Sequence, residues 1–255
     1  MAVDEGEIMK IVKIPYSESV NGVRLGPDKI VEKLKDIYSN EDGKVPDFEI
    51  DKVEISSDAH KKIYEKVLKE KDCIVLGGDH SITYPCFKAF ASKYKNPGLL
   101  VFDSHPDCAN PKTPYDFVGK LVEEGLLKTD NIVIVGLSNI MPQERKFLEK
   151  NKIDSFLMKD IFGNIENICD GVMELVNHFD GLYLSIDIDV LDPAFAPGTG
   201  TISPGGMTSR ELIYFVQRLK KLKNLRMVDI VEVNPDKDVN DMTSILAAKL
   251  IFELS

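Results

Sequence analysis

Short, continuous apolar runs alternate along the whole chain with longer segments of helical periodicity. Because most runs are continuous rather than alternating with polar residues, we expect both faces of the resulting sheet to be covered. Strands that alternate with helices indicate βαβ crossovers and a mainly parallel sheet. The eight predicted strands are residues 9–14, 48–55, 73–77, 98–102, 131–136, 153–158, 181–188 and 225–233.

Helix signals lie between these runs. Pro27 stands at a first-turn position, where its missing N–H costs nothing. Thr208 and Glu211 have the spacing of a capping box. An amphipathic helix is predicted near residues 244–254. Because no linker, low-complexity segment or repeat interrupts the pattern, we expect a single domain over residues 1–255.

Charge and cysteine content exclude several classes of protein. The chain has 42 acidic and 32 basic residues and a formal net charge of −10, which disfavours nucleic acid and anionic membranes as partners. The four cysteines are widely spaced, unlike a disulfide framework or a zinc ribbon. The acidic N-terminus shows no signal peptide, and no run is long enough to span a membrane. We therefore expect a soluble, cytoplasmic protein with a small-molecule substrate.

Potential metal ligands follow several predicted strands, at the edge where parallel sheets place their chemistry. His80 follows the third strand, and Asp187 and Asp189 end the seventh. The fourth strand leads into D-x-H-x-D, which comprises Asp103, His105 and Asp107. In extended chain, residues two apart project the same way, so the members of each set should converge.

These six residues supply four carboxylates and two imidazoles. Clustered acids cannot all stay ionised in a pocket unless cations neutralise them, and two divalent ions would match four carboxylates. The absence of a thiolate from the set favours Mn²⁺, although Ni²⁺, Co²⁺ or Fe²⁺ would fit. Two such ions would activate a water molecule, and the resulting negative site suits a cationic substrate. Taken singly, a loop acid usually caps a helix or turn, and His80 alone would fit a buried structural histidine.

Several ordered motifs resemble the arginase/agmatinase family of ureohydrolases. They are G-G-D-H-S (77–81), D-x-H-x-D (103–107), the segment 185–201 with its P-A-F-A-P-G-T-G-T ending, and V-E-V-N-P (231–235). Residues 22–27 also resemble the opening of that family, and P-A-F-A-P-G-T-G-T is closer to agmatinases than to arginases. The resemblance implies a three-layer α/β/α fold around an eight-stranded, mainly parallel sheet. It also implies two Mn²⁺ ions per chain, release of urea from a small guanidino or amidine substrate, and a homo-oligomer, either a trimer or a hexamer.

The resemblance also assigns roles to individual residues. His80 and Asp107 would bind one ion, and His105 and Asp189 the other, with Asp103 and Asp187 bridging them. Glu232 and Asp107 would be catalytic, with Glu232 pairing with the substrate guanidinium as a planar carboxylate can. Asn110 and Glu144 are further candidate substrate contacts, and Ser185 and Asp192 are candidate supports for the ligands. Asp192 with Pro193 would equally fit a turn.

Substrate-recognition positions depart from the family pattern. Residues 108–125 contain no histidine, whereas arginases and agmatinases carry one in this loop; formimidoylglutamases also lack it. Ala109, Asn110 and Pro111 do not reproduce the arginase carboxylate contacts. Ser138 and Met141 replace the usual Arg and Asp, while Glu144 is retained.

Agmatine, giving putrescine, is the nearest substrate hypothesis. Arginine, guanidinobutyrate, guanidine and formiminoglutamate stay open, as do another amidine or amide hydrolase and a non-catalytic metal-binding relative.

Overall fold

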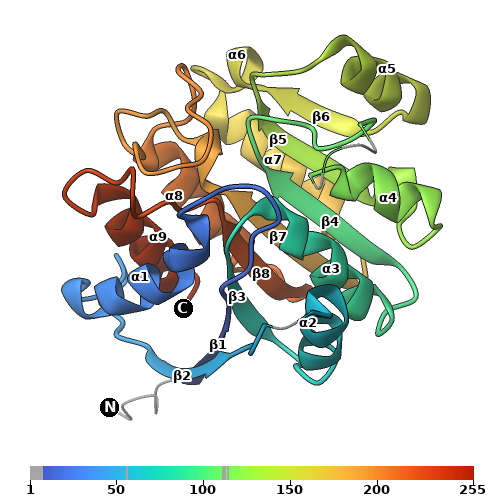
Figure 1. Ribbon diagram of the computed structural model, residues 1–255. Coiled ribbons are helices and arrows are strands. Elements are labelled where there is room, and N and C mark those ends of the chain that lie inside the picture. Colours follow the sequence, from blue (N-terminus) through green and yellow to red (C-terminus); the bar gives the residue numbers. More distant parts are fainter. Residues whose placement is uncertain (1–7, 56, 111–112, 114) are drawn as a thin grey trace.

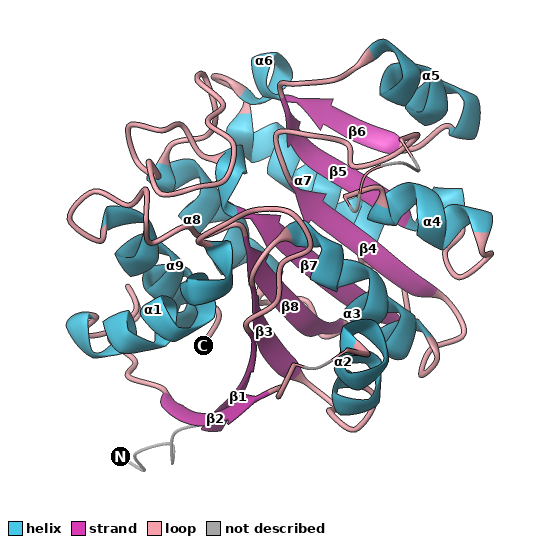
Figure 2. Ribbon diagram, in the orientation of Figure 1, coloured by secondary structure: helices cyan, strands magenta, loops and turns pink. Residues whose placement is uncertain are grey.

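The computed structural model describes residues 8–55, 57–110, 113 and 115–255 of the chain. Eight strands form one sheet in the order β2-β1-β3-β8-β7-β4-β5-β6, and every neighbouring pair is parallel (Figures 1 and 2). The strands are β1 (Ile8–Ile14), β2 (Asp47–Lys52), β3 (Cys73–Gly77), β4 (Pro97–Phe102), β5 (Ile132–Leu137), β6 (Asp154–Leu157), β7 (Gly181–Asp187) and β8 (Leu225–Val231). The predicted eight-stranded parallel sheet is confirmed.

Helices cover both faces of the sheet, as the continuous apolar strands require. One core cluster joins the sheet to α1 (Gly26–Lys33), α6 (Met158–Ile161), α7 (Ile165–Val176), α8 (Ser209–Leu219) and α9 (Met242–Glu253). The other joins it to α2 (Ala59–Val67), α3 (Thr83–Ala91), α4 (Phe117–Glu123) and α5 (Pro142–Asn151). Alternate residues of β8 enter alternate clusters: Val228 and Ile230 the first, Met227 and Val231 the second. The three-layer architecture is confirmed.

Local signals at the helix ends agree with the prediction in two places. Pro27 lies in the first turn of α1. Thr208 and Glu211 form the capping box of α8, with the Thr208 backbone N–H donating to Glu211 Oε2 at 2.7 Å. The prediction of an amphipathic C-terminal helix is wrong, because α9 packs against both α1 and α8 and is buried on most sides.

Four strands end earlier than predicted, among them the second at Lys52 and the sixth at Leu157. The seventh gives way at Ile188 to a short 3-10 helix, and the eighth ends at Val231 before Glu232 adopts a positive φ of 65°. No helix in the described ranges is long and apolar enough to cross a membrane. Residues 1–7, on which the expected absence of a signal peptide depends, lie outside the described part of the chain.

Packing between α8 and the sheet gives a first testable prediction. The Phe215 side chain is completely buried, and its ring centroid lies 5.0 Å from that of Phe102 in β4. We expect Phe215→Ala to lower the free energy of unfolding by about 3–5 kcal/mol, because it removes apolar contacts and leaves a cavity. Urea denaturation measures the loss.

Phe162 provides the matched control, since 84% of it is exposed. We expect Phe162→Ala to change stability by less than about 0.5 kcal/mol. Equal losses in the two variants would contradict the assignment of Phe215 to the core.

Candidate metal centre

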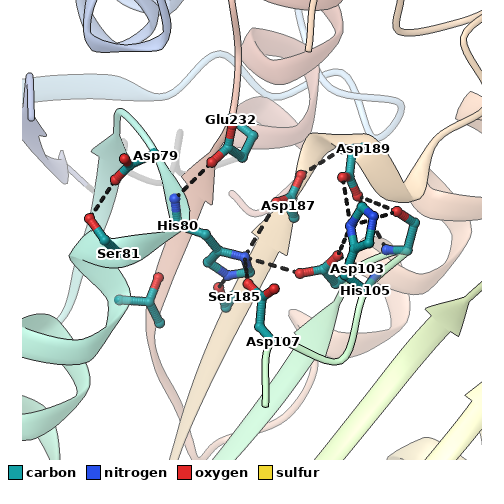
Figure 3. A network of polar contacts seen from close by, with 12 residues as sticks. Asp79, His80, Ser81, Asp103, His105, Asp107, Ser185, Asp187, Asp189 and Glu232 are labelled. Carbon is teal, nitrogen blue, oxygen red and sulfur yellow. Dashed lines mark hydrogen bonds and ion pairs between the residues drawn. The ribbon is translucent and has the colours of Figure 1, made fainter. Parts of the chain in front are cut away.

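All six predicted ligands meet at the carboxyl edge of the central strands (Figure 3). His80, Asp103 and Asp107 form one group of potential metal ligands, whose ligand atoms lie within 4.8 Å of one another. Asp103, His105 and Asp189 form a second such group. Asp103 belongs to both groups, so the two potential sites are adjacent and share a carboxylate.

The two imidazoles face the carboxylates through their Nδ1 atoms. His80 Nδ1 lies 3.0 Å from Asp103 Oδ2, 3.1 Å from Asp107 Oδ2 and 3.3 Å from Asp187 Oδ2. His105 Nδ1 lies 3.1 Å from Asp189 Oδ2 and 3.5 Å from Asp103 Oδ1. Asp187 thereby joins the group around His80.

Turns, rather than extended chain, bring these side chains together. β4 ends at Phe102, and the Asp103 carboxylate accepts the backbone N–H of His105 at 2.6 Å, which folds the loop back. Asp187 caps the 3-10 helix after β7 by accepting the Asp189 N–H at 2.8 Å. The expected convergence is therefore observed, but the argument from two-residue spacing in a strand is wrong.

The cluster has the electrostatics of a cation site. His80 Nδ1 and Asp103 Oδ2 are buried, and within the described residues neither has a hydrogen bond. Burial, followed by the charge of Asp103, raises the pKa of Asp107 to about 7. Burial, followed by the charge of Asp189, raises the pKa of Asp187 well above its usual range. A bound cation would offset these penalties and could be coordinated by both atoms, so the residues present fit a metal.

A hydrogen-bond chain behind His80 holds its ring. His80 Nε2 lies 2.9 Å from Ser185 Oγ, and that hydroxyl donates to Asp229 Oδ1 at 2.6 Å. Asp229 Oδ2 accepts the hydroxyls of Tyr183 and Thr83, each at 2.7 Å. Such partners fix the tautomer and orientation of a ligating histidine. Ser185 thus occupies the expected supporting position.

The supporting role of Asp229 was not predicted. Its signal in the sequence is an acid inside the apolar stretch 227–231 of β8, and its side chain is fully buried. Asp192 does not support the cluster in this way; it accepts the N–H groups of Ala194 and Gly205 at 2.9 and 2.7 Å. Of the two readings of Asp192, the turn is therefore correct.

Glu232 lies beside the ligand cluster in a strained conformation. Its N–H donates to Gly78 O at 2.8 Å, and its Oε1 accepts the His80 backbone N–H at 3.0 Å. Burial raises the pKa of Glu232 to about 8, although the His80 N–H opposes this shift. A Cβ atom at Gly200 would lie 2.6 Å from Glu232 Oε2, so that position must be glycine while the carboxylate stays in place.

Three of the six non-glycine residues with positive φ in the described part of the chain lie at the predicted site. Asp107, Ala109 and Glu232 have φ values of 47°, 62° and 65°, a region that costs a non-glycine residue about 1–3 kcal/mol. Such outliers persist only where surrounding contacts enforce them, and they cluster at functional sites. Asp107 belongs to the ligand cluster, Ala109 follows it in the same loop, and Glu232 lies in a second loop.

Glu144 and Asn110, the two remaining predicted substrate contacts, make hydrogen bonds to residues nearby in the sequence. Glu144 is mostly buried and accepts the Met141 N–H at 2.8 Å, which caps α5. The Asn110 carbonyl accepts the N–H of Thr113 at 2.9 Å. Residues 111, 112 and 114 lie outside the described residues, and the prediction for Pro111 is therefore not tested. Substrate contacts from Asn110 and Glu144 stay predictions.

Comparison with known proteins agrees with the fold. The Arginase family profile matches residues 9–255, so the chain belongs to the arginase family, whose hydrolases act on C–N bonds outside peptides. It is 29% identical over 272 residues to an arginase from Staphylococcus aureus (strain COL), covering 90% of each chain. The crystal structure of arginase from Bacillus subtilis superposes with a TM-score of 0.86 at 26% identity, covering 97% of this chain and 98% of the other.

A second relative has a different activity in its name. The chain is 40% identical over 190 residues to a formimidoylglutamase from Halalkalibacterium halodurans. The alignment covers 70% of this chain but only 58% of the length of that relative. The comparisons therefore define the family and leave its alternative substrates to be distinguished.

The hydroxyls that contact Asp229 give a prediction for metal affinity. We expect Ser185→Ala to weaken metal binding about 10–100-fold, because His80 loses the group that orients its ring. We expect a smaller loss for Tyr183→Phe, since Tyr183 contacts Asp229 but not His80. Competition with a chelator measures both affinities, and equal losses would contradict the role of Ser185.

Proposed function

We propose that this chain is a binuclear, manganese-dependent ureohydrolase that cleaves a guanidinium C–N bond of a small cationic substrate. The observation that carries the proposal is the pair of ligand groups sharing Asp103, with the Glu232 carboxylate held beside them by the backbone of His80. His80 and Asp107 would bind one ion, His105 and Asp189 the other, and Asp103 and Asp187 both. The chemistry that such an ion pair supplies is activation of water near neutral pH.

Oxygen and imidazole donors support the choice of Mn²⁺, with Ni²⁺, Co²⁺ or Fe²⁺ as alternatives. Cys108 is the cysteine beside a proposed ligand, and its thiol is buried. Burial raises the pKa of Cys108, so it stays a neutral thiol rather than a thiolate ligand.

Glu232 is proposed to hold the substrate cation. Its planar carboxylate matches two N–H groups of an amidinium, and the cation would compensate the buried negative charge. Gly200 leaves room for this carboxylate, and the His80 N–H fixes one of its oxygens. A cation held there would present its planar carbon toward the proposed metal ligands.

Asp107 is proposed to move the proton. Its side chain is 14% exposed, whereas those of Asp103, Asp187 and Asp189 are at most 5% exposed. In the overall reaction the water oxygen bonds to the amidinium carbon and the C–N bond to the substrate amine breaks. Asp107 would accept one proton from the attacking water and return it to the leaving nitrogen, and the second water proton would pass from the carbonyl oxygen to the released amine, giving urea and an ammonium product of the same total charge.

Agmatine, which would give putrescine and urea, is the first candidate substrate. Formiminoglutamate is the second, because residues 108–125 contain no histidine and the chain is 40% identical to a formimidoylglutamase over 190 residues. Hydrolysis of a formimino group would use the same ligand cluster and release formamide rather than urea. By family analogy, a cytoplasmic trimer or hexamer completes the proposal.

The test is product release by protein loaded with Mn²⁺, measured for agmatine, arginine, guanidinobutyrate, guanidine and formiminoglutamate. Urea from one of the guanidino compounds supports the ureohydrolase proposal. Formamide alone replaces it with the formimino reaction. No product from a protein with two bound ions would contradict a catalytic role on these substrates.

A bridging role predicts the effect of removing Asp187. We expect Asp187→Ala to lose bound metal and nearly all activity, because one carboxylate would serve both ions. Asp192→Ala is the matched control, since Asp192 is a nearby acid that makes a turn. Metal analysis after gel filtration checks both, and two tightly bound ions in Asp187→Ala would reject the bridge.

A role in binding the cation predicts a different pattern for Glu232. We expect Glu232→Gln to keep both ions and to lose more than about tenfold in kcat/KM, because the amide is neutral and charge-assisted hydrogen bonds are stronger. Steady-state kinetics and metal analysis on one preparation separate the two properties. Unchanged kinetics on the best substrate would exclude this role.

A further inference from the structure

The connection that leaves β1 runs beside the candidate site. We call residues 16–20 the strap; in Figure 1 it belongs to the dark blue chain that arches over the strands between β1 and α1. The Tyr16 carbonyl accepts the Asp79 N–H at 3.2 Å. A Cβ atom at Gly78 would lie 1.9 Å from that carbonyl oxygen, so the strap is in backbone contact with the β3 loop.

Asp79 anchors the strap from inside the protein. This carboxylate is fully buried, and its Oδ2 accepts Ser17 Oγ at 3.0 Å, the Glu18 N–H at 2.6 Å and the Ser19 N–H at 3.2 Å. The next residue, His80, gives its N–H to Glu232. The strap and the proposed cation-binding carboxylate are therefore fixed by two consecutive residues.

The far end of the strap meets two other loops of the site. The Ser19 hydroxyl contacts the hydroxyl of Tyr115, in the loop that follows Asp107. Val20 Cγ1 lies 3.4 Å from the place a Cβ would take at Gly200, the same place that lies 2.6 Å from Glu232 Oε2. Val20 thus lies close to the Glu232 carboxylate, and Tyr115 is joined to the same strap through Ser19.

Residues 16–20 include no cation. Val20 is apolar, and Glu18 is an acid whose carboxylate contacts His60 Nε2 at 2.8 Å. Burial raises the pKa of Tyr115 to about 12 despite the opposing contact with Ser19, and the charges of Glu232, Asp79 and Asp107 add to the rise. Tyr115 therefore offers a neutral hydroxyl.

Two cations lie close to this region without belonging to the strap. Lys237 Nζ donates to Gly200 O at 2.8 Å and is exposed. The Arg24 backbone packs beside Gly78, and this residue is also exposed. Of the two, Lys237 is the stronger candidate to attract a substrate carboxylate, because its partner Gly200 lies against Glu232.

We propose that the strap is a wall of the substrate site, with Val20 and Tyr115 as specificity-determining residues, and that it selects amidines whose remaining part is neutral or cationic over amidines that carry a carboxylate. The inference rests on the proposed function, because Glu232 must hold the amidinium for the rest of the substrate to reach this wall. A substrate carboxylate at this wall would lie near acidic groups and would find no cation among the wall residues. The wall would therefore select against such substrates by charge repulsion.

Agmatine and 4-guanidinobutyrate provide a matched pair of probes, since both carry a guanidino group and they end in an ammonium and a carboxylate respectively. We expect Mn²⁺-loaded protein to prefer agmatine by at least about tenfold in kcat/KM, equal to about 1.4 kcal/mol. Val20→Ala should reduce the preference mainly through KM, because the wall contacts bound substrate in the ground state as well.

A charge reversal tests the electrostatic part. Glu18→Lys should lower the agmatine preference by about fivefold, the upper range for an exposed charge. Glu174→Lys on α7 is the control, because it makes the same change at an exposed position outside the strap, and it should leave the preference unaltered. Equal shifts in both variants would mean that net charge, rather than the strap, sets the selection.

The Ser19–Tyr115 contact has a test that requires no turnover. Ser19→Ala and Tyr115→Phe should each speed hydrogen exchange at the backbone N–H groups of Glu18 and Ser19, and the double variant should do so no more than either single one. Additive effects would show that the two hydroxyls act separately. They would contradict the proposal that the strap and Tyr115 form one wall.

The outcomes separate this inference from the proposed function. Activity with equal or better use of guanidinobutyrate would overturn the wall while the ureohydrolase proposal stands. If Lys237→Met then removes the use of guanidinobutyrate, the selection belongs to Lys237. No turnover of any amidine by protein with two bound ions would overturn both proposals.

Discussion

Four carboxylates crowded at one edge of a parallel sheet are the constraint on which the rest of the site depends. Asp103, Asp187 and Asp189 are nearly inaccessible to solvent, and burial makes a negative charge there costly. The surrounding chain contributes two imidazoles and several backbone N–H groups directed at these oxygens. A cation-binding role explains why so many acidic side chains are buried together in this fold.

Parallel topology creates both the edge and its support. Ser185 and Asp229 are direct neighbours in the β7–β8 register, so the serine hydroxyl bridges from one strand to the ring of His80. Glu232 follows the same strand three residues after Asp229, at the place where the strand ends. These two adjacent strands thus orient His80, a proposed metal ligand, and place Glu232, the side chain proposed to bind the substrate.

Much of this arrangement was predictable from the sequence, for identifiable reasons. Continuous apolar runs revealed the strands, because burial on both faces removes polar alternation, and the strand ends contained the candidate ligands. The turns that bring Asp187 and Asp189 together were not predictable from strand spacing, since they depend on backbone hydrogen bonds to the side chains themselves. The partners of Asp229 and of the strap depend on tertiary contacts: Ser19 and Tyr115 are 96 residues apart, and Ser17 and Asp79 are 62 apart. Family membership fixes the class of reaction, whereas the proposed selection of the substrate rests on such long-range contacts.

The left-handed backbone at position 232 has a consequence for how this protein tolerates change. Glycine adopts that conformation without the steric cost that a glutamate carries, and it would also remove a buried acid. Selection for heat resistance alone would therefore favour the loss of the very side chain proposed to recognise the substrate. At position 232, stability favours glycine, whereas the proposed substrate binding requires glutamate. A glutamate retained there across relatives would indicate selection for activity.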